Sequence, residues 1–180
     1  MNIPNSLTTL RVLFIPLLIF FLLSRFEGKE ILAFFVFLTA ATTDMLDGFW
    51  ARKKKQTSPL GQLLDPIADK LLVSSAFICL VELGAVSSWM VIIIVGRELS
   101  ISGFRAIASA KGISIPPSFL GKLKMNVETV TICLLILGKK YMGRFYFLAH
   151  LGLWLVIVTA ILSAAEYYKK FGPRILSKSS

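Results

Sequence analysis

The chain has 180 residues, of which 56% are hydrophobic, and its mean hydropathy is +0.75. This apolar content exceeds the roughly 45 to 50% of soluble domains and excludes a disordered tail. The formal net charge is +10, but the basic residues lie at the ends of apolar blocks, which argues against nucleic-acid binding and favours a membrane protein.

Six apolar blocks follow one another along the chain, each near the length of about 20 residues that crosses a bilayer. They cover residues 7–23, 31–50, 71–86, 89–110, 119–137 and 146–167. No repeat or long linker divides the chain. We therefore expect an all-α fold: a polytopic membrane protein whose six transmembrane helices form one bundle and one domain over residues 1–180.

The charges of the connections predict the orientation of these helices, because Lys and Arg concentrate on the cytoplasmic side of a membrane. Thirteen basic residues fall on the side of the two termini and five on the other side. Both termini are therefore expected in the cytoplasm, in a multi-pass protein of the inner or plasma membrane. Arg97 and Arg105 lie within the fourth block, where a charge is costly unless it serves a cavity or a partner.

The two cysteines, Cys79 and Cys133, both lie inside apolar blocks. Their spacing is not that of paired metal ligands or of a disulfide framework. We interpret both as packing residues.

All four aspartates of the chain fall between the end of the second block and the start of the third, at Asp44, Asp47, Asp65 and Asp69. The first two are spaced i, i+3 and the last two i, i+4, so each pair lies on one face of its helix. Four carboxylates that face one another at a membrane boundary repel unless a cation neutralises them. Oxygen ligands without His or Cys suit a hard divalent cation such as Mg²⁺ or Mn²⁺.

Small and polar residues around the aspartates suit a ligand that carries phosphate. Gly48 and Ala51 clear the helix surface so that phosphates can approach the backbone, and Gly61 does the same in the following loop. Arg52 lies on about the same face as the first aspartate and can hold a phosphate through two hydrogen bonds. Ser58 adds a hydroxyl near the same place.

The pattern D-x2-D-G-x2-A-R-x8-G-x3-D-x3-D runs from Asp44 to Asp69. It resembles the signature of the CDP-alcohol phosphotransferases, and every signature residue is present. The resemblance covers nearly the whole chain. It implies six transmembrane helices around a cytoplasm-facing polar cavity, a homodimer, and two divalent ions that grip the diphosphate of a CDP-linked donor.

Carried over residue by residue, the resemblance implies that the four aspartates bind metal and that Asp69 also acts as general base. The residues implied to contact the CDP-linked donor are Asn5, Thr8, Gly48, Arg52 and Ser58. The leaving group would be CMP. Such phosphoryl transfer depends on charge neutralisation and in-line positioning more than on covalent catalysis.

Three segments further resemble the bacterial phosphatidylglycerophosphate synthases within that family, at residues 2–11, 96–105 and 121–124. This resemblance predicts CDP-diacylglycerol as the donor and sn-glycerol 3-phosphate as the acceptor. Met125 and Glu128 depart from the pattern, in which a small polar residue and Gln are expected at these positions.

The residue types near these segments suit an anionic acceptor. Arg97 and Arg105 are eight residues apart and share a helix face, and with Lys122 and Lys124 they can bind a phosphate. Glu98 is a candidate partner for one of these cations, which would make part of the cluster structural. A neutral acceptor would not need the cations.

Two alternatives stay open. Sibling enzymes of the family use inositol phosphate, serine or phosphatidylglycerol as acceptor. A divalent-cation or proton-coupled transporter also uses intramembrane carboxylates, but transporter sites usually lie near the midplane between repeated halves, whereas these aspartates lie at the cytoplasmic boundary. Metal-dependent release of CMP would separate an enzyme from a transporter.

Overall fold

The computed structural model describes residues 3–54, 59–113, 115–116 and 118–177, with side-chain positions for residues 10–43, 67–113, 115–116 and 118–173. Within these ranges the chain forms six α-helices and one short 3₁₀ helix, and no strand. The prediction of an all-α fold is confirmed for this part of the chain.

The helices follow the six apolar blocks. Their bounds are α1 (Ile3–Leu23), α2 (Lys29–Lys54), α3 (Pro59–Glu82), α4 (Ser88–Ala110), α5 (Phe119–Met142) and α6 (Phe147–Ser177), with the 3₁₀ helix η1 (Gly143–Tyr146) between the last two. Two helices extend well beyond their apolar blocks, α3 at its N-terminal end and α6 at its C-terminal end. In α5 the backbone is non-helical at Gly138 (φ +64°, ψ −176°), directly after its apolar block.

The C-terminal end of α3 is set by Gly84 rather than by the end of its apolar block. This glycine has φ +70°, in the left-handed region that costs a residue without Cβ little. The N–H groups of Gly84 and Ala85 donate to the carbonyls of Val81 and Leu80, each at 2.9 Å. This is the Schellman arrangement that closes a helix, so the apolar residues that follow form the turn into α4.

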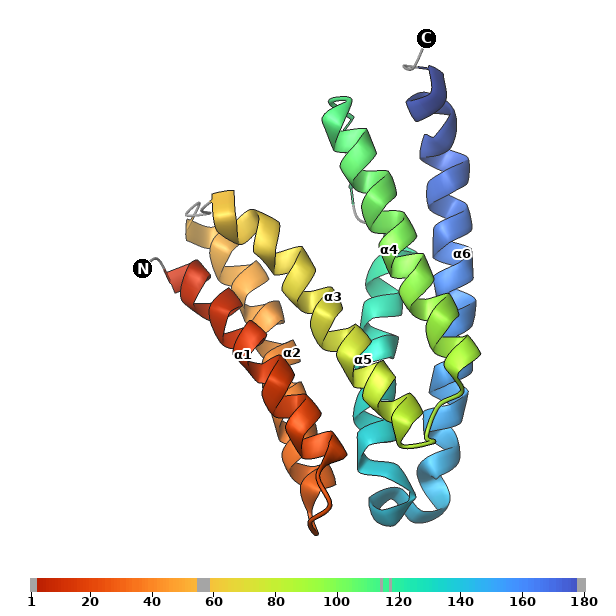
Figure 1. The fold of residues 1–180 in the computed structure, drawn as a ribbon. Helices are drawn as coiled ribbons and strands as arrows, with labels where there is room; N and C mark the ends of the chain where they lie inside the picture. Colours follow the sequence, from red (N-terminus) through yellow and green to blue (C-terminus); the bar gives the residue numbers. More distant parts are fainter. Residues whose placement is uncertain (1–2, 55–58, 114, 117, 178–180) are drawn as a thin grey trace.

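The six helices run alternately up and down the bundle. The N-terminal end of α1, the C-terminal ends of α2, α4 and α6, and the N-terminal end of α3 all lie at one end of the molecule (Figure 1). The α1–α2, α3–α4 and α5–α6 connections lie at the opposite end. α3 contacts α1, α4 and α5, while α5 packs on α6 and α2. α3 and α5 therefore connect the pair α1 and α2 with the pair α4 and α6.

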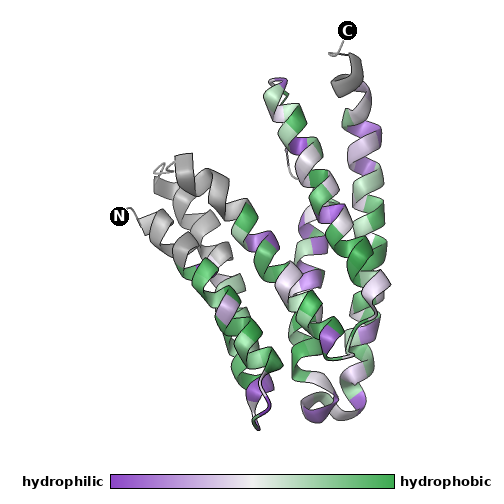
Figure 2. Cartoon of the chain, viewed as in Figure 1, coloured by the Kyte–Doolittle hydropathy of each residue, from purple (hydrophilic) through white to green (hydrophobic). Residues whose placement is uncertain are grey.

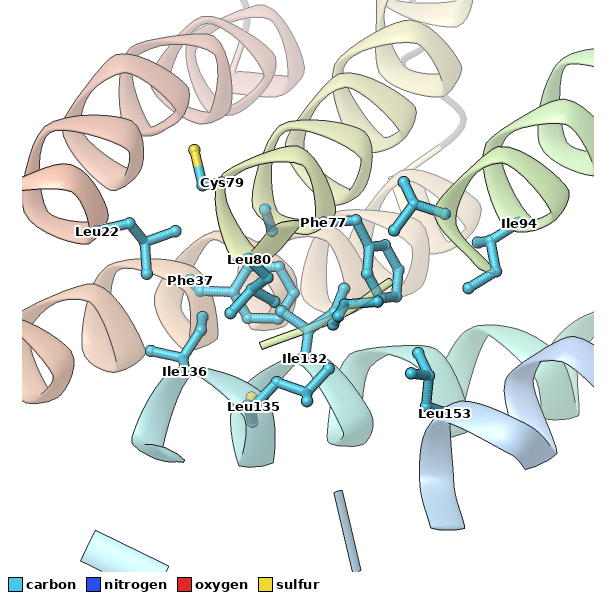
Figure 3. Close-up of a cluster of buried hydrophobic side chains, with 14 of the residues drawn as sticks. Leu22, Phe37, Phe77, Cys79, Leu80, Ile94, Ile132, Leu135, Ile136 and Leu153 are labelled. Carbon is cyan, nitrogen blue, oxygen red and sulfur yellow. The ribbon is translucent and has the colours of Figure 1, made fainter. Parts of the chain in front are cut away.

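The core fills the space between the helices and takes side chains from all of them. Phe37 of α2, Phe77 of α3, Ile94 of α4 and Ile132 of α5 are 0% exposed, and their side chains point toward one another (Figure 3). Buried side chains that interdigitate in this way hold neighbouring helices at fixed distances. Ile132 lies one turn after Glu128 on α5, so the polar cluster described below adjoins this core.

The α5–α6 contact includes one especially close approach. A Cβ atom built on Gly152 of α6 would lie 2.5 Å from Oγ1 of Thr131 of α5. The Thr131 hydroxyl itself donates to the carbonyl of Val127, at 2.7 Å. The absence of a side chain at residue 152 therefore sets how closely the two helices pack.

Large apolar side chains cover the outside of the bundle as well as its core. One such residue from each of the six helices is Leu13, Phe35, Ile78, Ile92, Phe119 or Trp154, and the exposed fractions of these six lie between 54% and 78%. Hydrophobic residues dominate the middle of the helices, and hydrophilic ones gather at the α1–α2 and α5–α6 connections (Figure 2). Among the described residues, the helical stretch Phe119–Pro173 is long and apolar enough to cross a membrane by length and composition, and Leu10–Leu23 is a shorter apolar helix.

Candidate active site

A series of charged side chains joins α4, α5 and α6. Arg97 donates from Nη1 to Oε1 of Glu98 at 2.5 Å and from Nη2 to Oγ of Ser163 at 2.5 Å. Lys124 donates from Nζ to the same Oε1 of Glu98 and to Oε2 of Glu128, both at 2.6 Å. Glu98 therefore bridges two cations. We call these residues the ionic cluster: Arg97, Glu98, Lys124, Glu128 and Ser163.

The ionic cluster is shielded from solvent. The side chains of Lys124 and Glu128 are 1% and 5% exposed, and those of Arg97 and Glu98 are 10% and 19% exposed. Charges at such depth are tolerated when they are paired and hydrogen-bonded. Two cations and two carboxylates make the cluster formally neutral.

Asp69 approaches this cluster from α3. Its side chain is half-buried, α3 contacts α5, and the negative charge of Asp69 acts on the carboxylate of Glu128. Oε1 of Glu128 is buried and has no hydrogen-bond partner among the described residues. The last aspartate of the motif thus lies near a carboxylate that helps to hold Lys124.

Arg105 lies about two turns beyond Arg97 on α4 and lines a different feature. Its Nη2 donates to the carbonyl of Ile115 at 3.1 Å. A cavity of about 350 Å³ is lined by Arg105, Ser109, Gly112, Ile113 and Ile115. Because the guanidinium is held by a neutral carbonyl there, its positive charge is available to an anion in the cavity.

The connection from α4 to α5, which borders this cavity, is held by α6. The hydroxyl of Tyr167 accepts a hydrogen bond from the N–H of Ser118 at 2.9 Å and lies 3.4 Å from the carbonyl of Pro116, to which it donates. The Ser118 hydroxyl in turn accepts from the N–H of Gly121 at 3.0 Å and caps α5. These bonds fix where α5 begins, and with it the position of the lysines on its first two turns.

The four cations predicted to bind the acceptor phosphate make different contacts in the structure. Arg97 and Lys124 meet at Glu98, whereas Arg105 lines the cavity at the C-terminal part of α4. Lys122 is exposed on α5. Glu98, which the sequence offered as a partner for one cation, pairs with two.

Most residues of the aspartate motif, and the two donor contacts predicted on α1, lie outside the described side chains. These are Asp44, Asp47, Gly48 and Arg52 on α2, Gly61 and Asp65 on α3, and Asn5 and Thr8 on α1. Ser58 lies outside the described residues altogether. The roles implied for these residues stay predictions.

The donor set of the motif fits a hard divalent cation, because it consists of carboxylate oxygens without His or Cys. The C-terminal part of α2 and the N-terminal part of α3, which carry the motif, lie at the same end of the bundle (Figure 1). Asp69 is the one aspartate whose side chain is described, and the described side chains contain no group of three or more possible metal ligands.

The sequence did not reveal the role of Glu128 as a partner of Lys124, nor that of Ser163 as a partner of Arg97. The i, i+4 spacing of Lys124 and Glu128 on one helix is a signal for a pair, and it was available in the sequence. Ser163 is 66 residues from Arg97, so only the packing of α6 on α4 brings the two together.

Comparisons with known proteins match most of this chain. A family model described as CDP-alcohol phosphatidyltransferase matches residues 1–164. The chain is 34% identical over 182 residues to the CDP-diacylglycerol–glycerol-3-phosphate 3-phosphatidyltransferase of Bacillus subtilis (strain 168), covering 94% of each protein. It is 34% identical over 170 residues to the protein of the same name from Rickettsia typhi, covering 93% of this chain and 96% of that one. A probable phosphatidylglycerophosphate synthase of Mycobacterium tuberculosis is also 34% identical, over 92% of this chain and 79% of its own length.

Proposed function

Because this chain belongs to the CDP-alcohol phosphatidyltransferase family, we propose that it transfers a phosphatidyl group from CDP-diacylglycerol to sn-glycerol 3-phosphate. The products are phosphatidylglycerophosphate and CMP. The observation that carries this assignment is the similarity, over 94% of both chains, to a protein named for that reaction. The aspartate motif at residues 44–69 supports the transfer from a CDP-linked donor.

The donor binds at the motif end of the bundle, near the C-terminal part of α2 and the N-terminal part of α3. The carboxylates of Asp44, Asp47, Asp65 and Asp69 hold two divalent ions, Mg²⁺ or Mn²⁺. When bound, these ions supply charge neutralisation for the diphosphate and for the departing CMP. The residues that hold the CDP part are Asn5, Thr8, Gly48, Arg52, Ser58 and Gly61.

Asp69 serves as the general base for the acceptor hydroxyl. A carboxylate within reach of the hydroxyl can take its proton as the new bond to phosphorus forms. Its half-buried position on α3, beside the ionic cluster, supports a place between donor and acceptor.

Arg97, Arg105, Lys122 and Lys124 bind the acceptor phosphate. Nε of Arg97 is buried without a hydrogen-bond partner among the described residues, and this N–H is suited to an anion that enters beside it. Among the described residues, two ammonium hydrogens of Lys124 are directed at carboxylates, and the third is suited to a phosphate oxygen. Arg105 offers its charge from the cavity wall.

The chain lies in the membrane as six spans with both termini and the active site on the cytoplasmic side. Exposed large apolar residues on every helix support this arrangement, because apolar side chains that face lipid do not carry the unfavourable free energy of exposure to water. The thirteen basic residues on the side of the termini, against five, support the orientation.

The protein acts as a homodimer. Gly96, Ser100, Gly103 and Ala106 form a small-residue face on α4, and all four are exposed within the single chain. A Cβ atom added at either glycine would meet nothing within 4 Å. Faces of this kind pack closely against another helix in membranes, which here would belong to a second copy.

The test uses the purified protein in detergent with CDP-diacylglycerol and Mg²⁺, and follows release of CMP. Glycerol 3-phosphate, inositol phosphate, serine and phosphatidylglycerol are supplied separately. Release with glycerol 3-phosphate alone is the expected result. Release with another acceptor only would replace the acceptor assignment by that of a sibling enzyme, and no release by a protein shown to be folded would favour the transporter alternative.

A further inference from the structure

Glu128 contacts Lys124, and the proposed function assigns it no contact with either substrate. Its Oε2 accepts a hydrogen bond from Nζ of Lys124 at 2.6 Å, and its side chain is 5% exposed. On the other side of the ammonium, Glu98 accepts at 2.6 Å. The ammonium is therefore clamped between carboxylates of two helices, α4 and α5.

We infer that Glu128 is a positioning residue for the acceptor phosphate: it holds the Lys124 ammonium at a fixed point in the ionic cluster, from which the ammonium binds the phosphate. This inference rests on the proposed function for its substrate. The clamp itself rests only on the geometry of the ionic cluster.

The side chain of Lys124 is long and has many rotamers unless other groups hold it. A Lys ammonium is a point charge on a flexible four-carbon stem with three donors and no preferred direction. Two charge-assisted hydrogen bonds, to Glu98 and Glu128, remove most of this freedom. A preset cation reduces the ordering cost of binding an anion.

The position of Glu128 relative to the proposed base gives the clamp its function. The charge of Asp69 acts on Glu128, so the same carboxylate lies near the proposed base and binds the proposed acceptor cation. A shift of Lys124 away from Glu128 would move the acceptor phosphate relative to the base. Reaction rates are sensitive to displacements of about 1 Å in such alignments.

Glutamine at residue 128 can preserve the clamp without the charge, because its amide oxygen also accepts a hydrogen bond at the same reach. Alanine or aspartate cannot: the first removes the acceptor and the second is shorter by one methylene group. Three variants, E128Q, E128A and E128D, therefore separate the hydrogen bond from the charge. E82Q is the matched control, because Glu82 is exposed at the far end of α3.

The first readout does not depend on activity. The folded protein in detergent is treated with an acetylating N-hydroxysuccinimide ester, and acetylation of each lysine is followed by mass spectrometry. Lys122, which is exposed two residues away, is the internal standard. In the unsubstituted chain and in E128Q, Lys124 should react at least about tenfold more slowly than Lys122, since exposing its ammonium breaks charge-assisted hydrogen bonds. In E128A and E128D this protection should fall severalfold.

The second readout compares the effect of each variant on the KM for glycerol 3-phosphate with its effect on the KM for CDP-diacylglycerol. E128A and E128D should raise the KM for glycerol 3-phosphate about tenfold, the factor that corresponds to one charge-assisted hydrogen bond, with the KM for CDP-diacylglycerol unchanged. E128Q should return the acceptor KM to within about threefold of the original value, since it keeps the hydrogen bond. E82Q should behave as the unsubstituted chain.

Several outcomes would overturn the inference. Lys124 that stays protected in E128A or E128D would show that Glu128 does not hold it. Equal changes in the two KM values would assign Glu128 a structural role only. If E128A fails to fold, E128D and E128Q decide the question by the same criteria. If the unsubstituted chain releases no CMP with glycerol 3-phosphate, the proposed function fails, while the acetylation pattern still tests the clamp.

Discussion

The ammonium nitrogen of Lys124 lies 2.6 Å from a carboxylate oxygen of Glu128, one turn further along α5, and the two side chains are only 1% and 5% exposed. Ion pairs at this spacing on an exposed helix surface contribute only about 0.2–0.5 kcal/mol. Inside a protein, removing one partner leaves an uncompensated charge and costs about 3–5 kcal/mol. The pair therefore ties the position of a proposed acceptor-binding cation to the packing of the bundle.

Hydrogen bonds of Glu98 connect this pair on α5 to α4, and a hydrogen bond to Ser163 connects α4 to α6. Glu98 binds Lys124 and Arg97 through one oxygen, and Arg97 reaches Ser163. Movement of any one of the three helices would break a charged hydrogen bond. The ionic cluster therefore couples helix packing to the geometry of the proposed acceptor site.

Substitution of Asp69 tests the assignment of the general base. Asp69→Asn keeps the size of the side chain but removes the group that takes a proton, so kcat should fall by about 10²–10⁴. Binding of CDP-diacylglycerol should change much less, because three aspartates of the motif are left. Turnover is measured by CMP release and donor binding by equilibrium titration. A variant that turns over at the original rate would remove Asp69 from the role of base.

Removal of divalent metal tests the cofactor assignment. Treatment with EDTA should abolish CMP release, because the phosphates and the four aspartates would face one another without a neutralising cation. Addition of Mg²⁺ or Mn²⁺ in excess should restore the activity. Full activity after complete chelation, checked by metal analysis of the protein, would contradict a metal-dependent mechanism.

The helices could be predicted from the sequence because each apolar block is long and most of the blocks are bounded by polar residues or glycine. The end of α3 could not, since the apolar run continues through the turn that Gly84 creates. Hydropathy reports which residues avoid water. A Schellman turn depends on backbone conformation and on hydrogen bonds to the preceding helical turn.

The chemistry of the site could be predicted in part. The four aspartates and Arg97 stand out because charges are rare in apolar blocks, and the pattern of the motif identifies the family. The different contacts of Arg105 and Lys124 could not be predicted, since they depend on how the helices pack. Nor could the Arg97–Ser163 contact, which joins helices that are distant in sequence.

Replacement of Arg105 tests the site of the acceptor phosphate. Arg105→Ala removes a guanidinium from the wall of the cavity near the end of α4, and the loss of one charge-assisted hydrogen bond of about 1.5–3 kcal/mol raises the acceptor KM by about 10–100-fold. The KM for the donor should not change. Lys140→Ala, at an exposed position near the opposite end of the bundle, is the control. An acceptor KM equal to that of the control would exclude Arg105 from phosphate binding.

The close approach of α5 and α6 leads to a prediction about stability. Gly152→Ala would place a Cβ atom 2.5 Å from Oγ1 of Thr131, so the helices must separate or Thr131 must turn, at a cost of about 1–3 kcal/mol. The melting temperature in detergent should fall accordingly. Gly172→Ala on the same helix meets nothing within 4 Å and should leave it nearly unchanged. Thr131→Ala combined with Gly152→Ala should recover part of the loss, because it removes the atom that clashes. Equal melting temperatures for the two single glycine variants would show that this contact does not limit the packing of α5 on α6.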